Sequence, residues 1–395
     1  MNTVYGIFCL VSGLLAAYAI RNRLRPEHFQ DGRHANLNGL RGFLSLIMFV
    51  CHAATWQQYL ADGEWRISDL PSLIIPGQTG IVLFFMITGF LFAKKYLDSK
   101  NKEIDWVRVY CSRVLRLYPA YLFSMAILFA VIAIISFQEK IFLEKFQIIS
   151  YIKWVLFTIP GTPPLNGIPE TSIIMAGVTW SLTFEWAFYF SLPIIAAALG
   201  TKKSWPAIAF GATLLTATLY FIPFYGLIYF MIFFGILSAL IDKHTNFQEI
   251  LNRKIFGVIA ILLLLLNGFI NNKTSYNATS VAIIGLSFII FSAGNDIFGL
   301  LTKKSMQIFG MGTYSIYLLH GPLLYITFKT MQNNGHELYK SNEGFWFIAI
   351  GLAPALVLLS VFSYVFIEAP AMKHQGKATK LTRKILQLKP PGKQE

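Results

Sequence analysis

The sequence predicts an all-α, polytopic helical membrane protein with about 11 transmembrane helices. Of its 395 residues, 55% are hydrophobic and only 13% are charged. Several apolar runs reach about 17 to 25 residues, the length at which an α-helix crosses the hydrocarbon core of a bilayer. A soluble domain with one hydrophobic core does not need so many runs of this length, so we expect a membrane protein.

The apolar runs follow one another along the whole chain and are separated by polar loops. The two runs on either side of Pro223 are together far too long for one crossing, so this proline predicts a tight turn between two spans. The predicted spans are approximately 3–20, 39–56, 78–93, 119–137, 178–199, 205–222, 224–241, 255–270, 278–293, 306–331 and 344–367.

Lysines and arginines indicate which side of the membrane each loop faces. If the N-terminus lies outside, one side of the membrane receives 26 of the 33 Lys and Arg residues, including those of the C-terminal tail. This bias makes the basic side, and with it the C-terminus, cytoplasmic. Topology and contact with anionic membrane lipids then account for the net charge of +14, and no nucleic-acid partner is needed.

Both ends of the chain carry basic segments. No Lys or Arg precedes the first span and a basic cluster follows it, so we expect residues 1–36 to form an uncleaved helix and a basic cytoplasmic linker. Residues 371–395 form a basic cytoplasmic tail, in which apolar residues recur at helical spacing. A helix on the inner leaflet and a disordered tail explain this pattern equally well.

The cysteines do not indicate a metal site or a disulfide framework. Cys9, Cys51 and Cys111 have neither CxxC spacing nor a Cys/His pattern typical of zinc sites. We therefore expect no metal.

Ionisable side chains inside the spans are costly in hydrocarbon and are candidate functional residues for that reason. His52 and His320 are the two histidines within spans, and Glu185 is the acid that lies well inside one. Arg41 precedes His52 by eleven positions, which places both on nearly the same helix face, about 16 Å apart along the axis. Two histidines and a glutamate suit proton transfer. A snorkelling arginine with a structural histidine is the alternative interpretation.

The loop after the third span ends in a second group of cations, Arg113 and Arg116, followed by Pro119. The two arginines lie about one helical turn apart, and such a pair can bind phosphate oxygens through its fork-shaped guanidinium groups. Ordinary anchoring of the helix at the cytoplasmic surface explains the same spacing.

The outer segment at about 138–177 combines a moderately apolar stretch with a Pro/Gly-rich loop. The apolar stretch is too short to cross the membrane, so we expect an interfacial or re-entrant helix followed by a lid-like loop. Tyr151 and Trp154 could stack on sugar rings there, although aromatic residues are also common at the membrane surface without any ligand.

Five motifs occur in order between Leu37 and Pro370. They are LNGLRGFLSLIMFVCH with Arg41 and His52, GIVLFFMITGFLF with Gly89 and Phe90, SRVLRLYP with Arg113, Arg116 and Pro119, WSLTFEWAFYF with Trp180, Ser181 and Glu185, and YSIYLLH with His320. On these motifs the sequence resembles the membrane acyltransferase 3 family, whose members are integral membrane O-acyltransferases that modify surface glycans. Two positions depart from the family pattern: Thr88 replaces a serine, and Ala369 stands where the family often has arginine.

The resemblance implies a fold and a reaction. Residues 37–370 correspond to the family's ten-helix membrane core, to which the first span is added. The implied reaction moves an acyl group, usually acetyl, from cytoplasmic acyl-CoA to a hydroxyl of a cell-surface or lipid-linked glycan on the outer side of the bacterial inner membrane. Acetyl-CoA is therefore the expected donor. The sequence does not decide between a homodimer and a separate acyl-accepting protein as a partner.

The same resemblance implies roles for particular residues. Either His52 acts as a general base on the acceptor hydroxyl, or His52 or another group takes the acyl group covalently and passes it outward. The alternative function is a transporter or flippase for a lipid-linked glycan or a proton-coupled solute, although the chain has no visible internal repeat of the kind that such transporters often have. The expected residues are His52, Glu185 and His320 in catalysis, Arg41, Arg113 and Arg116 in donor binding, and Tyr317, Trp180 and Ser181 in substrate binding.

Overall fold

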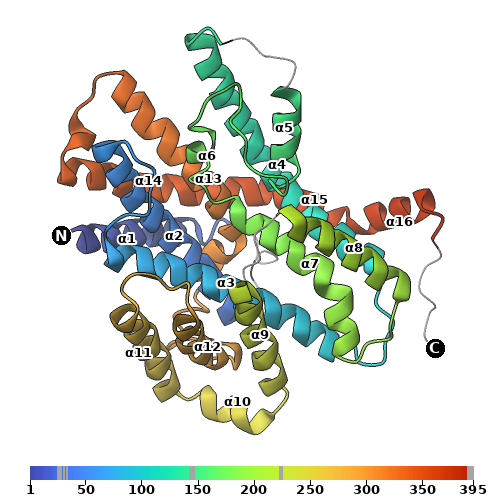
Figure 1. Ribbon diagram of the computed structural model, residues 1–395. Helices are drawn as coiled ribbons and strands as arrows, with labels where there is room; N and C mark the ends of the chain where they lie inside the picture. The colour runs from blue at the N-terminus through green and yellow to red at the C-terminus, as the bar shows by residue number, and fades with distance from the viewer. Residues whose placement is uncertain (25–28, 30–31, 33, 142–146, 222–225, 389–395) are drawn as a thin grey trace. The chain divides into compact units, whose positions relative to one another are not determined.

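The structure is a computed structural model that describes residues 1–24, 29, 32, 34–141, 147–221 and 226–388 (Figure 1). These residues form helices and connecting loops, and the described part of the chain contains no β-strand. The all-α class expected from the sequence is therefore confirmed.

Each of the eleven predicted spans falls on a helix. Within the described residues, six helices are long and apolar enough to cross a membrane, or seven if α9 and the sharply bent α10 (Thr245–Leu251) count as one span. The chain is thus a multi-pass membrane protein, and eleven crossings remain a prediction. Pro223 lies outside the described residues. The helices are α1 (Asn2–Ile20), α2 (Ala35–Asp62), α3 (Pro71–Leu97), α4 (Trp106–Gln138), α7 (Trp180–Ala198), α8 (Trp205–Phe221), α9 (Gly226–Ile241), α11 (Lys254–Ile270), α12 (Ala278–Ser292), α13 (Lys304–Asn333) and α14 (Asn342–Ser363).

Short helices connect or follow the long ones. The outer segment contains α5 (Gln147–Val155) and α6 (Thr171–Ile174), and a single turn, η2 (Leu338–Lys340), precedes α14. After α14 the chain forms a π-helical turn, η3 (Tyr364–Glu368), then α15 (Ala369–Lys373) and α16 (Gln375–Ile385).

The chain divides into two compact units. The first unit comprises Met1–Leu91 and Tyr225–Val361, and the second comprises Phe92–Phe224 and Phe362–Glu395. The boundaries fall inside α3 and near the end of α14.

In the first unit, α2 packs closely along α13, while α9, α11 and α12 lie side by side (Figure 1). Small residues make the first contact possible: a Cβ atom at Gly42 would fall on the backbone of Phe309 and Gly310, and one at Gly310 would fall on Asn38. The Asn38 amide also donates a hydrogen bond to the Gln307 side chain, 2.8 Å away. Close backbone approach and buried amide pairs are typical of helix contacts inside membranes.

In the second unit, α7 packs on α8, and α4 packs on α15, α16 and η3. Asp105 begins α4 as its N-cap, where its carboxylate accepts from the Arg108 backbone N–H and pairs with Arg383 of α16. The tail is thus helical over 375–385, and its Leu381 and Ile385 are 58% and 69% exposed. This helix favours the first of the two interpretations of the tail, a helix on the inner leaflet.

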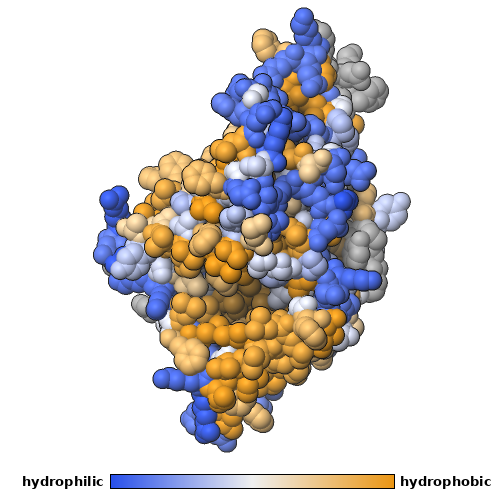
Figure 2. Space-filling view, turned by 90° about the vertical axis from the view of Figure 1, so that its left-hand side faces the viewer, coloured by the Kyte–Doolittle hydropathy of each residue, from blue (hydrophilic) through white to orange (hydrophobic). Residues whose placement is uncertain are grey.

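The surface is rich in apolar side chains, as a lipid-facing surface must be. Figure 2 shows broad hydrophobic areas on one face of the molecule. Helices α1 and α11 each expose a series of large apolar side chains, which are Val4, Ile7, Phe8, Val11 and Leu15 on α1 and Ile255, Val258, Leu262, Leu265, Leu266 and Phe269 on α11.

Candidate functional site

The two histidines predicted from separate spans meet in the first unit. Nε2 of His320, on α13, lies 3.1 Å from Nδ1 of His52, on α2, and the ring centroids are 4.9 Å apart. His320 is completely buried, whereas His52 is partly exposed. Tyr317 lies edge-on to His320 with ring centroids 6.1 Å apart.

The packing of α2 on α13 explains why the histidines meet. Gly42 faces Gly310, and each histidine lies ten residues beyond its glycine. Two contacts at equal spacing along both helices mean that the helices run parallel and in register. This direction is also what the alternating topology requires, because both helices are even-numbered predicted spans. Beyond the histidines, Trp56 continues the contact by packing against Tyr325 and Phe328.

Backbone carbonyls determine which ring nitrogens carry protons. Nδ1 of His320 is 3.0 Å from the Ile316 carbonyl, and Nδ1 of His52 is 3.1 Å from the Met48 carbonyl. Because a carbonyl oxygen only accepts, each Nδ1 must be the N–H that donates. In neutral His320 the lone pair is then on Nε2. This nitrogen accepts from Nδ1–H of His52, which also donates to the Met48 carbonyl. One ring nitrogen of the two histidines still has a lone pair that neither contact uses. It is Nε2 of His52, which can therefore act as a base or a nucleophile.

Arg41 and His52 lie on one face of α2, and that face continues beyond them to Tyr59. Tyr59 is seven positions after His52, about 10 Å further along the helix axis on nearly the same face. Its ring centroid is 5.3 Å from that of Trp56 and 5.6 Å from that of Trp65, and Nζ of Lys329 lies 5.6 Å from the Tyr59 ring centroid. One helix face thus carries a cation, an imidazole and an aromatic cluster in succession.

The second unit brings Glu185 and Arg113 together through Tyr189. The Tyr189 hydroxyl, one turn after Glu185 on α7, donates to the Glu185 carboxylate and also interacts with the Arg113 guanidinium of α4. The guanidinium carbon of Arg113 lies 5.3 Å from the Phe92 ring centroid and 5.9 Å from that of Tyr189. These contacts hold the arginine in one position with its charge against two aromatic rings.

Arg116 has a separate set of neighbours. Its Nη1 lies 3.4 Å from Sδ of Met372 on α15, and its guanidinium interacts with the Tyr364 hydroxyl of the π-helical turn. The same turn ends at Glu368, whose side chain is completely buried. Arg113 and Arg116 are thus one turn apart on α4, as predicted, but contact different elements.

Trp180 and Ser181 lie in the first turn of α7, away from Glu185 by about one turn. Trp180 is 40% exposed and packs edge-on against Phe184, and the Ser181 hydroxyl donates to the Val178 carbonyl at 3.3 Å. Both residues are therefore placed at a helix end.

The fold and the motifs agree with a match to a known family. The model of a family described as an acyltransferase domain matches residues 34–365, which is most of the chain. This chain belongs to the membrane acyltransferase 3 family. It is therefore a multi-pass membrane acyltransferase, which uses an acyl donor and an acceptor.

Two curated relatives of the acyltransferase have been found by sequence. The acyltransferase MdmB of Streptomyces mycarofaciens is 29% identical over 175 residues, which cover 41% of this chain and 39% of that protein. Nodulation protein 10 of Rhizobium leguminosarum bv. viciae is 24% identical over 381 residues, which cover 88% of this chain and 95% of that protein. No solved structure matches the acyltransferase.

Several residues around the predicted site of the acyltransferase were not anticipated from its sequence. Tyr189 follows Glu185 by four positions, and this helical spacing is the signal in the sequence that the Tyr189 hydroxyl can reach the Glu185 carboxylate. Tyr59 follows His52 by two turns, a register that is equally visible in the sequence. Tyr364 is far along the sequence from Arg116, and only the fold connects the two. Trp65 follows Tyr59 closely along the chain, in the loop after α2, but the path of that loop cannot be read from the sequence.

The outer segment contains a short surface helix, α5, and a buried tryptophan, Trp154. Helix α5 is short and exposes Ile148, Ile149 and Ile152, which suits a helix lying in the membrane surface. Trp154 is completely buried, and its Nε1 donates to the Pro163 carbonyl at 2.9 Å. Its ring is therefore inaccessible to a sugar in this conformation, so the stacking role considered for it is not supported.

Proposed function

We propose that this acyltransferase is an O-acetyltransferase of the bacterial inner membrane, with its N-terminus outside and its C-terminus in the cytoplasm. It moves an acetyl group from cytoplasmic acetyl-CoA to a hydroxyl of a cell-surface or lipid-linked glycan on the outer side. The observation that carries this proposal is the His52–His320 pair, which leaves Nε2 of a partly exposed imidazole with a lone pair for proton transfer inside a membrane protein.

His52 is the group that reacts. Its Nε2 takes the proton of the acceptor hydroxyl as the hydroxyl oxygen attacks the thioester carbonyl. The new C–O bond forms, the C–S bond breaks, and the proton on Nε2 passes to the departing thiolate. His320 stabilises the imidazolium through its Nε2, which accepts from Nδ1 of His52.

A covalent route uses the same nitrogen. Nε2 of His52 would attack the thioester, release the thiol, and hold the acyl group until the acceptor hydroxyl displaces it. The two routes differ in one observable, because only the second leaves labelled acyl on the protein when donor is supplied without acceptor and the reaction is quenched.

Arginines are proposed to bind the phosphates of the donor. Arg41 lies on the His52 face of α2, about 16 Å away along the helix axis, a distance that suits a cofactor with its charged end at the membrane surface and a long flexible arm. Arg113 and Arg116 are the other two donor-binding candidates, and the phenolic contacts of each restrict its movement. Glu185 is assigned a positioning role, because its bond to Tyr189 fixes the ring on which Arg113 rests.

The acceptor is proposed to approach from the outer end of the His52 face. Tyr59 and Trp65 lie there and could stack on a sugar ring, with Tyr317 beside His320 nearer to the reacting atoms. Trp180 and Ser181 remain proposed substrate-binding residues.

The test supplies labelled acetyl-CoA to membranes with and without the protein and follows the label into envelope glycans. We expect His52→Ala to lower glycan labelling by about 100-fold or more, as loss of a general base does. His336→Ala is the matched control, because His336 is exposed and lies outside the predicted spans. Full glycan labelling by the His52→Ala protein would overturn the assignment.

A further inference from the structure

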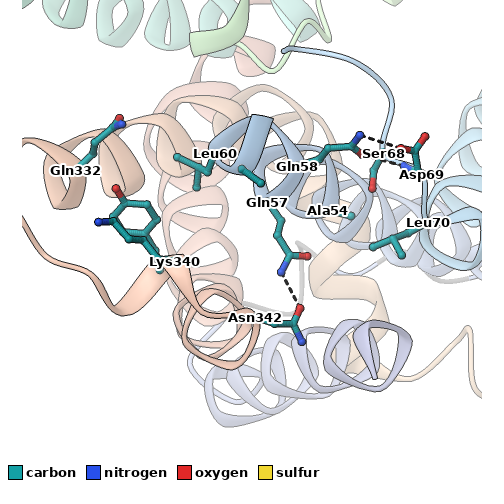
Figure 3. Close-up of a pocket in the computed structure, with 12 residues that line it drawn as sticks. Ala54, Gln57, Gln58, Leu60, Ser68, Asp69, Leu70, Gln332, Lys340 and Asn342 are labelled. Carbon is teal, nitrogen blue, oxygen red and sulfur yellow. Dashed lines mark hydrogen bonds between the residues drawn. The ribbon is translucent and has the colours of Figure 1, made fainter. Parts of the chain in front are cut away.

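A pocket of about 690 Å³ lies at the C-terminal end of α2 in the first unit (Figure 3). Its volume is within the range of small-molecule sites. One wall comes from α2 and the loop that follows it, and the other comes from the end of α13, η2 and the start of α14. Its polar lining consists mainly of Gln57, Gln58, Asp69, Gln332, Lys340 and Asn342.

The two charges in the pocket lining are paired within the protein. Asp69 accepts from Arg66 at 2.8 Å, and this bond holds the pKa of the Asp69 carboxyl below its usual value. Lys340 pairs with Glu337, with Nζ 2.6 Å from Oε1. Neither charge therefore calls for a ligand of opposite sign.

The remaining polar groups are uncharged and can both donate and accept: the amides of Gln57, Gln58, Gln332 and Asn342 and the hydroxyls of Ser68 and Tyr339. Figure 3 shows Gln57 joined to Asn342 and Gln58 joined to Asp69, so the amides of Gln57, Gln58 and Asn342 are held in fixed positions around the pocket. Fixed, uncharged groups of both kinds suit a ligand with many hydroxyls and no charge.

The pocket faces away from the reacting histidine. It begins at Ala54 and includes Gln57, Gln58 and Ala61, which lie about 140° to 240° around α2 from His52. Gln57 is five residues beyond His52, about 7.5 Å along the axis. A ligand in the pocket therefore lies near the acceptor end of the site but not at the reacting nitrogen.

We propose that this pocket binds an uncharged sugar unit of the acceptor that is not itself acylated. The inference rests on the proposed function, since it assumes that the acceptor is a glycan. Binding of a non-reacting unit would position the reacting hydroxyl, because remote contacts supply energy that orients the reacting centre.

The test uses the purified full-length protein, with Ala61→Trp to fill the pocket. Ala61 is exposed, so the new side chain enters the pocket without displacing a buried group. Glu64→Trp is the matched control, because Glu64 is exposed on the adjoining loop and does not line the pocket. The probes are maltotetraose, cellotetraose and chitotetraose at 10 mM, with glucose 6-phosphate as the anionic comparison, and the readout is the melting temperature.

We expect at least one tetrasaccharide to raise the Tm of the wild type and of Glu64→Trp, and to leave that of Ala61→Trp unchanged. An equal rise in Ala61→Trp, a rise with glucose 6-phosphate alone, or no rise with any tetrasaccharide would overturn the proposal. Because no acyl donor is present, these outcomes are independent of catalysis. Release of CoA from acetyl-CoA by the wild type, measured separately, tests the proposed function.

Discussion

The hydrogen bond between His52 and His320 can be tested by two substitutions of His320. Nε2 of His320 accepts from His52, so His320→Gln can preserve an acceptor there, whereas His320→Leu cannot. We expect His320→Leu to lower kcat by about 100-fold or more, because His52 loses the acceptor that stabilises its imidazolium, and His320→Gln to retain more activity.

The readout is kcat and KM for the donor across pH 5 to 9, together with the Tm of each variant. If His320 had only a structural role, both substitutions would lower the Tm and would change kcat to the same extent. The proposed role instead predicts a difference in kcat at similar Tm. Equal kcat in the two variants would therefore contradict it.

At the residue scale, the chemistry of single side chains was enough to select candidate residues, and their roles in catalysis remain predictions. His52, Glu185 and His320 were selected because ionisable groups are costly in hydrocarbon, and the structure brings the two histidines into contact. The protonation pattern of the pair could not be predicted, because it depends on which carbonyl each ring faces. The partner of Glu185 could not be predicted either, and within its own unit its carboxylate accepts from the Tyr189 hydroxyl.

At the scale of elements, the glycines of LNGLRGF explain how the site is held. A Cβ at Gly42 would fall on the backbone of Phe309 and Gly310, ten residues from the histidine contact. We expect Gly42→Ala to push α2 from α13, to reduce stability by about 1 to 3 kcal/mol, and to lower activity by moving His52 from His320. The measurement is the Tm in detergent beside the acyl transfer rate.

The matched control is Gly351→Ala in α14, where an added Cβ meets nothing within 4 Å. There the helix propensity of alanine should leave stability unchanged or raise it by up to about 1 kcal/mol. If Gly42→Ala behaved like Gly351→Ala, the close approach of α2 and α13 would not be what holds the histidines together.

The positions of the apolar runs predicted where the helices lie, but not where each helix begins and ends or where its geometry changes. Each predicted span coincides with a helix because long apolar runs have no other stable form in a bilayer. The π-helical turn at 364–368 was not predicted, since a segment of 5 residues is too short to show as a change in apolar periodicity. The start of α4 at Trp106, well before the apolar run, follows from the N-cap at Asp105, a signal that the sequence does contain.

At the scale of the whole molecule, the distribution of charge and the parallel packing of α2 and α13 support the same topology. Alternating crossings make the second and tenth spans parallel, and the paired contacts along α2 and α13 agree with that direction. The positive-inside rule predicts that the N-terminal ends of both helices face the cytoplasm. Arg41 and Lys304 lie near those ends, where a soluble anionic donor would first meet the protein.

The last prediction separates binding of the donor from the chemical step. Acetyl-CoA should raise the Tm of the whole protein, because a ligand of the folded state stabilises it by about 2.7 kcal/mol at 100 times its Kd. Arg113→Ala should weaken donor binding by roughly 10- to 150-fold, the loss expected of a charged hydrogen bond worth about 1.5 to 3 kcal/mol, and so shrink the rise. His52→Ala should keep the full rise while losing activity, and Arg108→Ala, which removes an exposed cation from the same helix, should keep both. If neither acetyl-CoA nor a longer acyl-CoA changes the Tm of the wild type, the arginines do not bind the donor and the proposed reaction loses its cytoplasmic substrate.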